Sequence, residues 1–221
     1  MALPVALPVG IACWHCLLAL FVHAASALRE KQKHNQQMHP TLYSIGHSTH
    51  SSAQLCALLS SAGVSCVLDV RRFPVSRRWP QFNLTPLQAA LARAGMDYLH
   101  LPALGGRRDQ LGTAALSNAG LADAGLRAYA DYAQTPAFQR AMGDLLARAG
   151  AASTAMLCAE VDWRHCHRQI IADHALLQGM PVQHIRQNGT SEVAELNPLA
   201  VLTADGRIHY PRRRAGLFAD S

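Results

Sequence analysis

The sequence predicts an α/β fold with one mostly parallel β-sheet and helices on both of its faces, a Rossmann-like layered sandwich. Short apolar stretches typical of buried strands alternate with helical patterns of about ten to fifteen residues. Glycines follow the helical patterns at Gly63, Gly95, Gly150 and Gly179, as is usual at helix ends. Two short segments that flank Ala204–Gly206 predict a C-terminal β-hairpin.

Composition indicates an ordinary globular domain. The chain has 221 residues, half of them hydrophobic, which is enough for a sizeable core and argues against disorder. The net charge is +6, and every lysine or arginine after Met38 is an arginine. Arginine suits bidentate recognition of phosphate or carboxylate, although the alanine-rich composition also suggests a general compositional bias. Six cysteines are too few for a disulfide framework in a chain of this length, so we expect a reduced, cytoplasmic protein.

The N-terminal segment differs from the rest of the chain, because an apolar stretch is followed there by a polar tract. No basic residue precedes the apolar stretch, as it would in a signal peptide, and two prolines disfavour a spanning helix. We therefore expect residues 1–37 to be a leader outside the domain, either a spurious extension or a signal-like segment, disordered or a lone helix. One α/β domain is expected over residues 38–221, with no stable membrane association.

The first half of the domain shows three strand patterns and two helix patterns. In chain order they are a strand at 42–45, a helix capped by Ser51 or Ser52, a strand at 66–70, a helix that starts at Thr85-Pro86, and a strand at 96–101. A long basic loop, Arg71–Pro80, separates the second strand from its helix.

The second half starts with an ambiguous segment, residues 107–134, with a weak helix at 126–132. The elements expected after it are a helix from Thr135-Pro136, a strand at 155–157, a helix that starts near Cys166, a strand at 182–185, a short helix near 192–196, and the hairpin. The strand order stays open, and the five β/α units also fit an incomplete barrel.

Chemically active side chains follow several of these strands. Because parallel strands place their carboxyl ends at one edge of a sheet, we expect these side chains to converge there. The densest group is Cys158–Arg168, which holds two thiols, two histidines, two arginines and Glu160 within eleven residues. The candidate catalytic residues are Cys158, Cys166, His47 and Glu160, and the candidate anion-binding residues are Ser48, Asp69, Arg71, Ser76, Arg77, His100, His167 and Arg168.

Several kinds of chemistry fit Cys158–Arg168. Arginines beside helix N-termini can bind an anion, and Cys166 lies near a helix start between two histidines, which favours a nucleophilic thiolate. A metal site is a further interpretation, although no standard ligand spacing is matched, and so is a structural or redox disulfide between the two cysteines. The metal ligands would be Cys158, Glu160, Cys166 and His167, with His47 nearby. The Cys158-x5-Arg164 spacing of phosphate-binding loops is not accepted, because the loop carries acids and no glycine.

The loop Arg71–Phe82 interleaves arginines with aromatic residues. Such a loop suits stacking on bases and contacts with phosphates, which predicts a nucleic-acid-binding module as an alternative function. A lid whose aromatic residues pack on the edge of the domain explains the same pattern.

Six ordered motifs resemble the family called domain of unknown function 488. They are Tyr43–Thr49, Asp69–Arg77, Gln81–Asn83, Tyr98–Gly106, Leu157–Glu160 and Cys166–Arg168. The resemblance covers about residues 41–185 and implies a compact α/β protein of bacteria or archaea, but no settled activity. The positions that match are Gly46, His47, Ser48, Asp69, Arg71, Pro74, Ser76, Phe82, His100, Gly105, Cys158, Glu160, Cys166, His167 and Arg168.

The function that these residues favour is an enzyme acting on a small phosphorylated or nucleotide-like substrate. Arg71 and Arg168 would bind the anion, one of the two cysteines would act as nucleophile or ligand, and His47 and Glu160 would transfer protons. A metal-dependent hydrolase is a further alternative. The sequence specifies no cofactor.

Overall fold

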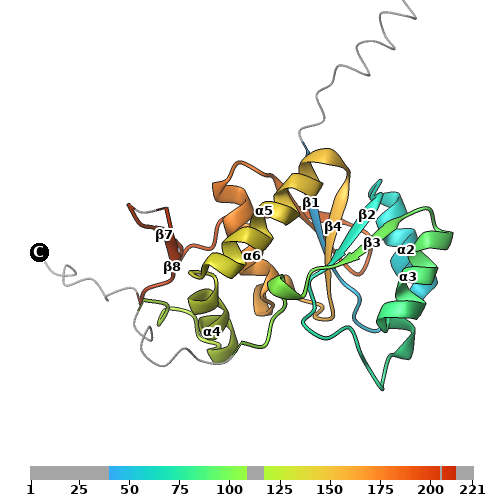
Figure 1. Cartoon of the computed structure of the whole chain (residues 1–221), viewed down its shortest axis with the longest axis horizontal. Coiled ribbons are helices and arrows are strands. Elements are labelled where there is room, and N and C mark those ends of the chain that lie inside the picture. Colours follow the sequence, from blue (N-terminus) through green and yellow to red (C-terminus); the bar gives the residue numbers. More distant parts are fainter. Residues whose placement is uncertain (1–39, 109–116, 205, 213–221) are drawn as a thin grey trace, which may run out of the picture. The chain divides into compact units, whose positions relative to one another are not determined.

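A six-stranded open sheet forms the centre of the computed structural model, which describes residues 40–108, 117–204 and 206–212 (Figure 1). The strand order is β3-β2-β4-β1-β5-β6; the first five strands are parallel, and β6 is antiparallel to β5. The strands are β1 (Leu42–Gly46), β2 (Cys66–Asp69), β3 (Asp97–His100), β4 (Thr154–Cys158), β5 (Val182–Ile185) and β6 (Ser191–Val193). This order confirms the mostly parallel sheet and settles the choice against a barrel. The expected leader lies outside the described residues, and the domain boundaries stay a prediction.

Helices cover both faces of the sheet, as the sequence predicted. One apolar cluster joins the sheet to α2 (Ser52–Ser61) and α3 (Leu84–Arg93). The other joins it to α4 (Ala124–Tyr132), α5 (Pro136–Ala151) and α6 (Arg168–Leu177). Figure 1 shows the two groups of helices on opposite sides of the strands. Within the described residues, none of the helices has the length and hydrophobicity needed to cross a lipid bilayer.

Two helix starts follow from local sequence signals. Ser51 and Gln54 form a capping box, in which each side chain accepts a hydrogen bond from the other's backbone N–H. The hydroxyl of Thr135 accepts from the N–H of Phe138, and proline fills the first position of α5. In both helices the residue expected as a cap takes that position.

The expected start of α3 at Thr85-Pro86 was wrong, because the helix begins at Leu84 with Asn83 as its N-cap. A 3-10 turn, Pro80–Phe82, precedes it, and the helix starts two residues earlier than the cap-and-proline signal suggested. Pro86 then lies in the first turn of α3, where a backbone N–H has no acceptor within the helix, so the proline removes no helical hydrogen bond.

The short helix expected near 192–196 was also wrong, because the chain forms β6 there. Asn188 and Gly189 turn the chain back, with φ at +84° for Gly189, and the N–H of Arg186 donates to the carbonyl of Thr190 at 2.8 Å. The C-terminal hairpin is confirmed as β7 (Val201–Leu202) paired with β8 (Ile208–His209).

Sheet topology points to one place for a ligand. β4 lies between β2 and β1, but the helix after β4 covers one face of the sheet while those after β1 and β2 cover the other. Adjacent strands whose helices leave in opposite directions have a crevice at their carboxyl ends. A ligand is therefore expected at the end of β4, where Cys158 lies.

Candidate functional site

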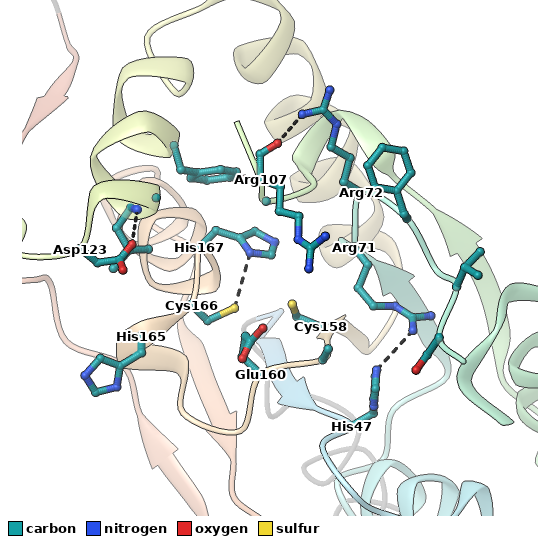
Figure 2. A pocket seen from close by; sticks show the side chains of 18 of the residues that line it. His47, Arg71, Arg72, Arg107, Asp123, Cys158, Glu160, His165, Cys166 and His167 are labelled. Carbon is teal, nitrogen blue, oxygen red and sulfur yellow. Dashed lines mark hydrogen bonds between the residues drawn. The ribbon is translucent and has the colours of Figure 1, made fainter. Parts of the chain in front are cut away.

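A cavity of about 410 Å³ lies at this carboxyl edge (Figure 2). The segment after β1 contributes His47, the segment after β2 contributes Arg71, the end of β4 contributes Cys158, and the segment before α6 contributes Cys166. The predicted site residues that line the cavity are His47, Arg71, Ser76, Cys158, Glu160, Cys166 and His167. Ser48, Asp69, Arg77, His100 and Arg168 are not among its lining residues.

The two thiols and one imidazole meet at the base of this cavity. The Sγ atoms of Cys158 and Cys166 and a ring nitrogen of His167 all lie within 4.8 Å of one another. Nδ1 of His167 is 3.5 Å from Sγ of Cys166, and Nε2 is 2.9 Å from the carbonyl oxygen of Val70. Because a carbonyl only accepts, Nε2 carries a hydrogen, and in the neutral ring Nδ1 is the free base. His167 is therefore oriented to take a proton from Cys166.

The two thiols have opposite acidities. Burial opposes ionisation of Cys166, but a hydrogen bond from Cys158 and the nearby charges of His167 and Arg168 hold its pKa well below the usual value. The hydrogen bond to Cys166, together with burial, raises the pKa of Cys158 well above the usual value. These directions favour the thiolate form at Cys166 and the thiol form at Cys158.

Arg168 lies behind the thiolate and is only 1 % exposed. Its Nε donates to Sγ of Cys166 at 3.4 Å, and its other nitrogens donate to Oγ of Ser44 at 3.1 Å and to the carbonyl of Glu160 at 2.6 Å. In the described part of the chain, no carboxylate pairs with this guanidinium. A buried charge needs a partner of opposite sign, and the Cys166 thiolate is the anion within reach.

Arg71 is held by an acid that does not line the cavity. Its Nε lies 2.8 Å from Oδ1 of Asp69, which is fully buried and also accepts a hydrogen bond from the hydroxyl of Tyr98 at 2.8 Å. Nη1 of Arg71 donates to the carbonyl of Phe82 at 2.8 Å, and a ring nitrogen of His100 lies 2.8 Å from the carbonyl of Arg71. In this structure Asp69 and His100 therefore hold Arg71 in place, and a direct role in ligand binding stays a prediction for both.

His47 stacks on Phe82, with ring centroids 4.0 Å apart. Its Nδ1 is 3.2 Å from the carbonyl of Ser48, and its Nε2 is 3.3 Å from Nη1 of Arg71. Burial and the charge of Arg71 lower the pKa of His47 to about 4. The ring is thus neutral at pH 7, with Nδ1–H donating and Nε2 accepting. Its predicted role in proton transfer stays a prediction.

The mouth of the cavity is more basic than the predicted site. Figure 2 shows the side chain of Arg107 entering the cavity between His167 and Arg71. Arg72 also lines the cavity and donates to the backbone carbonyl of Arg107. The exposed carboxylate of Glu160 lines the cavity and forms no hydrogen bond or ion pair within the described residues, and its role in proton transfer stays a prediction.

Sequence reasoning missed the residues that α4 and the segment before it supply. Arg107, Asp123 and Tyr129 line the cavity, yet they fall where the helical pattern was weak. The Gly105-Gly106 turn was the available signal. A Cβ at Gly106 would lie 2.8 Å from Nδ1 of His167, so this position has to stay small for the imidazole to reach Cys166.

The basic loop lies partly at the cavity and partly at the surface. Phe82 is buried, and Trp79 lines the cavity together with Phe73, whose side chain is 64 % exposed. Arg77 and Arg78 are exposed as well. Nucleic-acid binding by this loop stays a prediction.

The fold and the site together define an α/β protein with two buried free cysteines at the carboxyl edge of its sheet. The model of the family described as Domain of unknown function DUF488 matches residues 51–175, which is more than half of the chain, and the chain belongs to this family. No curated protein and no solved structure matches the chain.

Proposed function

We propose that the protein is an enzyme that uses Cys166 as a nucleophile on a small anionic substrate of the phosphorylated or nucleotide-like kind. The observation that carries the proposal is the setting of Cys166 in the cavity wall. Its Sγ is 3.5 Å from Nδ1 of His167 and 3.4 Å from Nε of Arg168. An imidazole and a guanidinium beside a thiol keep it ionised, and the thiolate is the nucleophilic form.

The rest of the cavity suits an anion of modest size. Its volume of about 410 Å³ falls in the range of small-molecule sites. Arg107 and Arg72 provide positive charge at the mouth, and guanidinium groups bind phosphate or carboxylate through paired hydrogen bonds. Glu160 is placed to transfer a proton to or from the bound substrate. The unpaired thiols suit the reducing cytoplasm, where we propose that the protein works.

A metal-dependent hydrolase is the second candidate. Cys158, Cys166 and His167 are three donors near one point, and the Nε2–H bond from His167 to a backbone carbonyl is common among metal-binding histidines. The charge of Arg168 beside Cys166 disfavours a dication there, which is why we rank this candidate second. Elemental analysis of the purified protein separates the two candidates.

Replacing the nucleophile tests the proposal directly. Turnover is screened with p-nitrophenyl phosphate and a panel of nucleoside mono- and diphosphates. We expect Cys166→Ser to lower turnover by about a hundredfold or more, because a serine hydroxyl is not ionised at neutral pH. Cys66→Ser is the matched control, since Cys66 is also buried but lies outside the cavity.

Thermal unfolding of each variant is measured beside its activity. A Cys166→Ser protein that keeps its activity would contradict the proposal. A variant that loses stability and activity in equal measure would assign Cys166 a structural role instead.

A further inference from the structure

Two free cysteines are close enough to react with each other. Cys158 is the last residue of β4, and Cys166 lies two residues before the start of α6, directly before its N-cap His167. Their sulfur atoms lie within 4.8 Å of each other. The other described cysteines, Cys56 and Cys66, line neither this cavity nor the thiol cluster.

We propose that Cys158 and Cys166 form a dithiol–disulfide couple that hydrogen peroxide oxidises and a small thiol such as glutathione reduces. Oxidation removes the thiolate and so switches the site off. The switching part of the inference rests on the proposed function, whereas formation of the disulfide does not.

Oxidation proceeds in two balanced steps. The Cys166 thiolate attacks one peroxide oxygen, the O–O bond breaks, and hydroxide leaves and takes a proton from solvent to become water. Cys166 is then a sulfenic acid, oxidised by two electrons while the peroxide is reduced. The sulfur of Cys158 next attacks Cys166, the S–O bond breaks, and the OH leaves with the Cys158 proton as water. A disulfide results, and a second water is released.

The surroundings favour this order of events. Cys166 is the ionised member of the pair and reacts first, while Cys158 keeps its proton and is in reach as the resolving thiol. Both sulfurs line a cavity, yet Cys158 is only 5 % exposed and Cys166 only 2 %. A small oxidant such as hydrogen peroxide can reach them more easily than a bulky aromatic disulfide reagent.

The buried guanidinium favours the reduced state. In the disulfide, Arg168 loses its anionic partner and keeps only a hydroxyl and carbonyl oxygens. A couple whose reduced form is stabilised in this way gives a readily reduced disulfide. Two molecules of glutathione restore the dithiol and leave as one glutathione disulfide, so the switch resets in a reducing compartment.

Peptide mapping of the full-length protein tests the couple without any substrate. Trypsin cuts after Arg148, Arg164 and Arg168, which places Cys158 in peptide 149–164 and Cys166 in peptide 165–168. After treatment with one equivalent of hydrogen peroxide and blocking of free thiols, we expect these two peptides joined by a disulfide. Glutathione should separate them again. In Cys158→Ser, Cys166 should instead stop at the sulfenic acid, which dimedone labels, and Cys56→Ser is the control that should behave like the wild type.

The outcomes are separable. Peroxide that leaves both peptides unlinked, or that oxidises Cys56 or Cys66 first, would overturn the couple, and this wild-type readout needs no variant to fold. A disulfide that glutathione cannot reduce would overturn the switch and leave a structural bond. A Cys158–Cys166 disulfide that forms in a protein without turnover of any tested substrate would contradict the proposed function but support the redox couple. Turnover that continues when all of the protein carries the disulfide would contradict the switching role.

Discussion

At the scale of single residues, Arg168 determines the chemistry of the site. Buried arginines usually pair with a carboxylate, but here the nearest anion is the sulfur of Cys166. Each group therefore stabilises the charge of the other. Arg168 also bonds to Ser44 on β1 and to the backbone of Glu160 after β4, so the same side chain links two strands to the nucleophile.

Removing the guanidinium should make Cys166 a weaker acid. In Arg168→Met, which keeps most of the side-chain volume, we expect the pKa of Cys166 to rise, because the sulfur loses a positive neighbour and the hydrogen bond from Nε of Arg168. The pH dependence of iodoacetamide labelling at Cys166, read by peptide mass, measures the change.

Arg164→Gln is the matched control, because Arg164 is exposed and pairs with Glu192 rather than with the cysteines. An unchanged labelling profile in Arg168→Met would mean that the guanidinium does not hold the thiolate. Circular dichroism checks that both variants remain folded.

The sequence singled out the residues of the site better than their partners. Cys158, Cys166 and His167 stood out because thiols and imidazoles are rare and these follow a strand pattern. The pairing of Arg168 with Cys166 could not be predicted, since it depends on how the chain enters α6. Arg107 was missed because its segment has no regular periodicity, and its position depends on a turn that keeps φ at 56°.

At the scale of elements, the chain that leaves the end of β4 beside β1 leaves no space for a side chain at Gly46. A Cβ there would lie 1.8 Å from the carbonyl oxygen of Glu160 and 3.1 Å from Nη2 of Arg168. The two strand ends approach closely because the N–H of His47 donates to the carbonyl of Cys158 at 2.9 Å. The glycine therefore lets the thiols and Arg168 share one edge of the sheet.

Adding a methyl group at Gly46 should destabilise the fold and displace the residues of the site. We expect Gly46→Ala to lower the free energy of unfolding by about 3 kcal/mol or more, because backbone atoms have to move apart. Urea unfolding measures the loss.

Gly143→Ala is the control, since Gly143 is an exposed position of α5 with open space around it. Alanine favours a helix interior, so this change should stabilise the protein by up to about 1 kcal/mol. Equal stability of the two variants would contradict the close approach at Gly46.

Elements were predictable where a short local signal decides them. The Ser51 cap and the Thr135-Pro136 start follow directly from side chains that bond to the first turn. β6 was missed although Asn188-Gly189 is a strong hairpin signal, because the residues after it also have helical propensity. The order of the strands in the sheet could not be predicted from the sequence, since it depends on contacts between segments that are distant in the chain.

At the scale of the whole molecule, buried histidines make stability depend on pH. Burial lowers the pKa of His174 to about 4 and that of His184 to about 3, and burial with Arg71 lowers that of His47 to about 4. Unfolded histidine takes up its proton near pH 6.5. These groups stabilise the fold above pH 6.5, and the stabilisation is lost as the pH falls towards 4. Burial raises the pKa of Asp173 to about 6, which acts in the opposite direction, since protonation below pH 6 favours the folded state.

Three histidines outweigh one aspartate, so we expect the free energy of unfolding to fall by on the order of 3 kcal/mol from pH 7 to pH 5. Denaturant titrations at several pH values measure this change. His174→Leu should flatten the profile, because within the described residues Nε2 of His174 has no hydrogen-bond partner and the ring packs against Phe138.

His165→Asn should keep the wild-type profile, since the His165 side chain is 83 % exposed. A profile that does not change between pH 7 and pH 5, or a His174→Leu protein as acid-sensitive as the wild type, would show that other groups control the acid response.

The central position of β4 has a consequence for how the protein is made. β4 joins β1 to β2, yet about a hundred residues of chain separate it from β1. A ribosome therefore releases β1 and β2 long before β4, and until then the two strands lack the strand with which both of them pair. Until β4 inserts, Cys158 has no fixed neighbour, and Cys166 cannot have its final acidity. The thiolate centre is thus acquired in the last stage of assembly, and a nascent chain that stalls before α6 has no such centre.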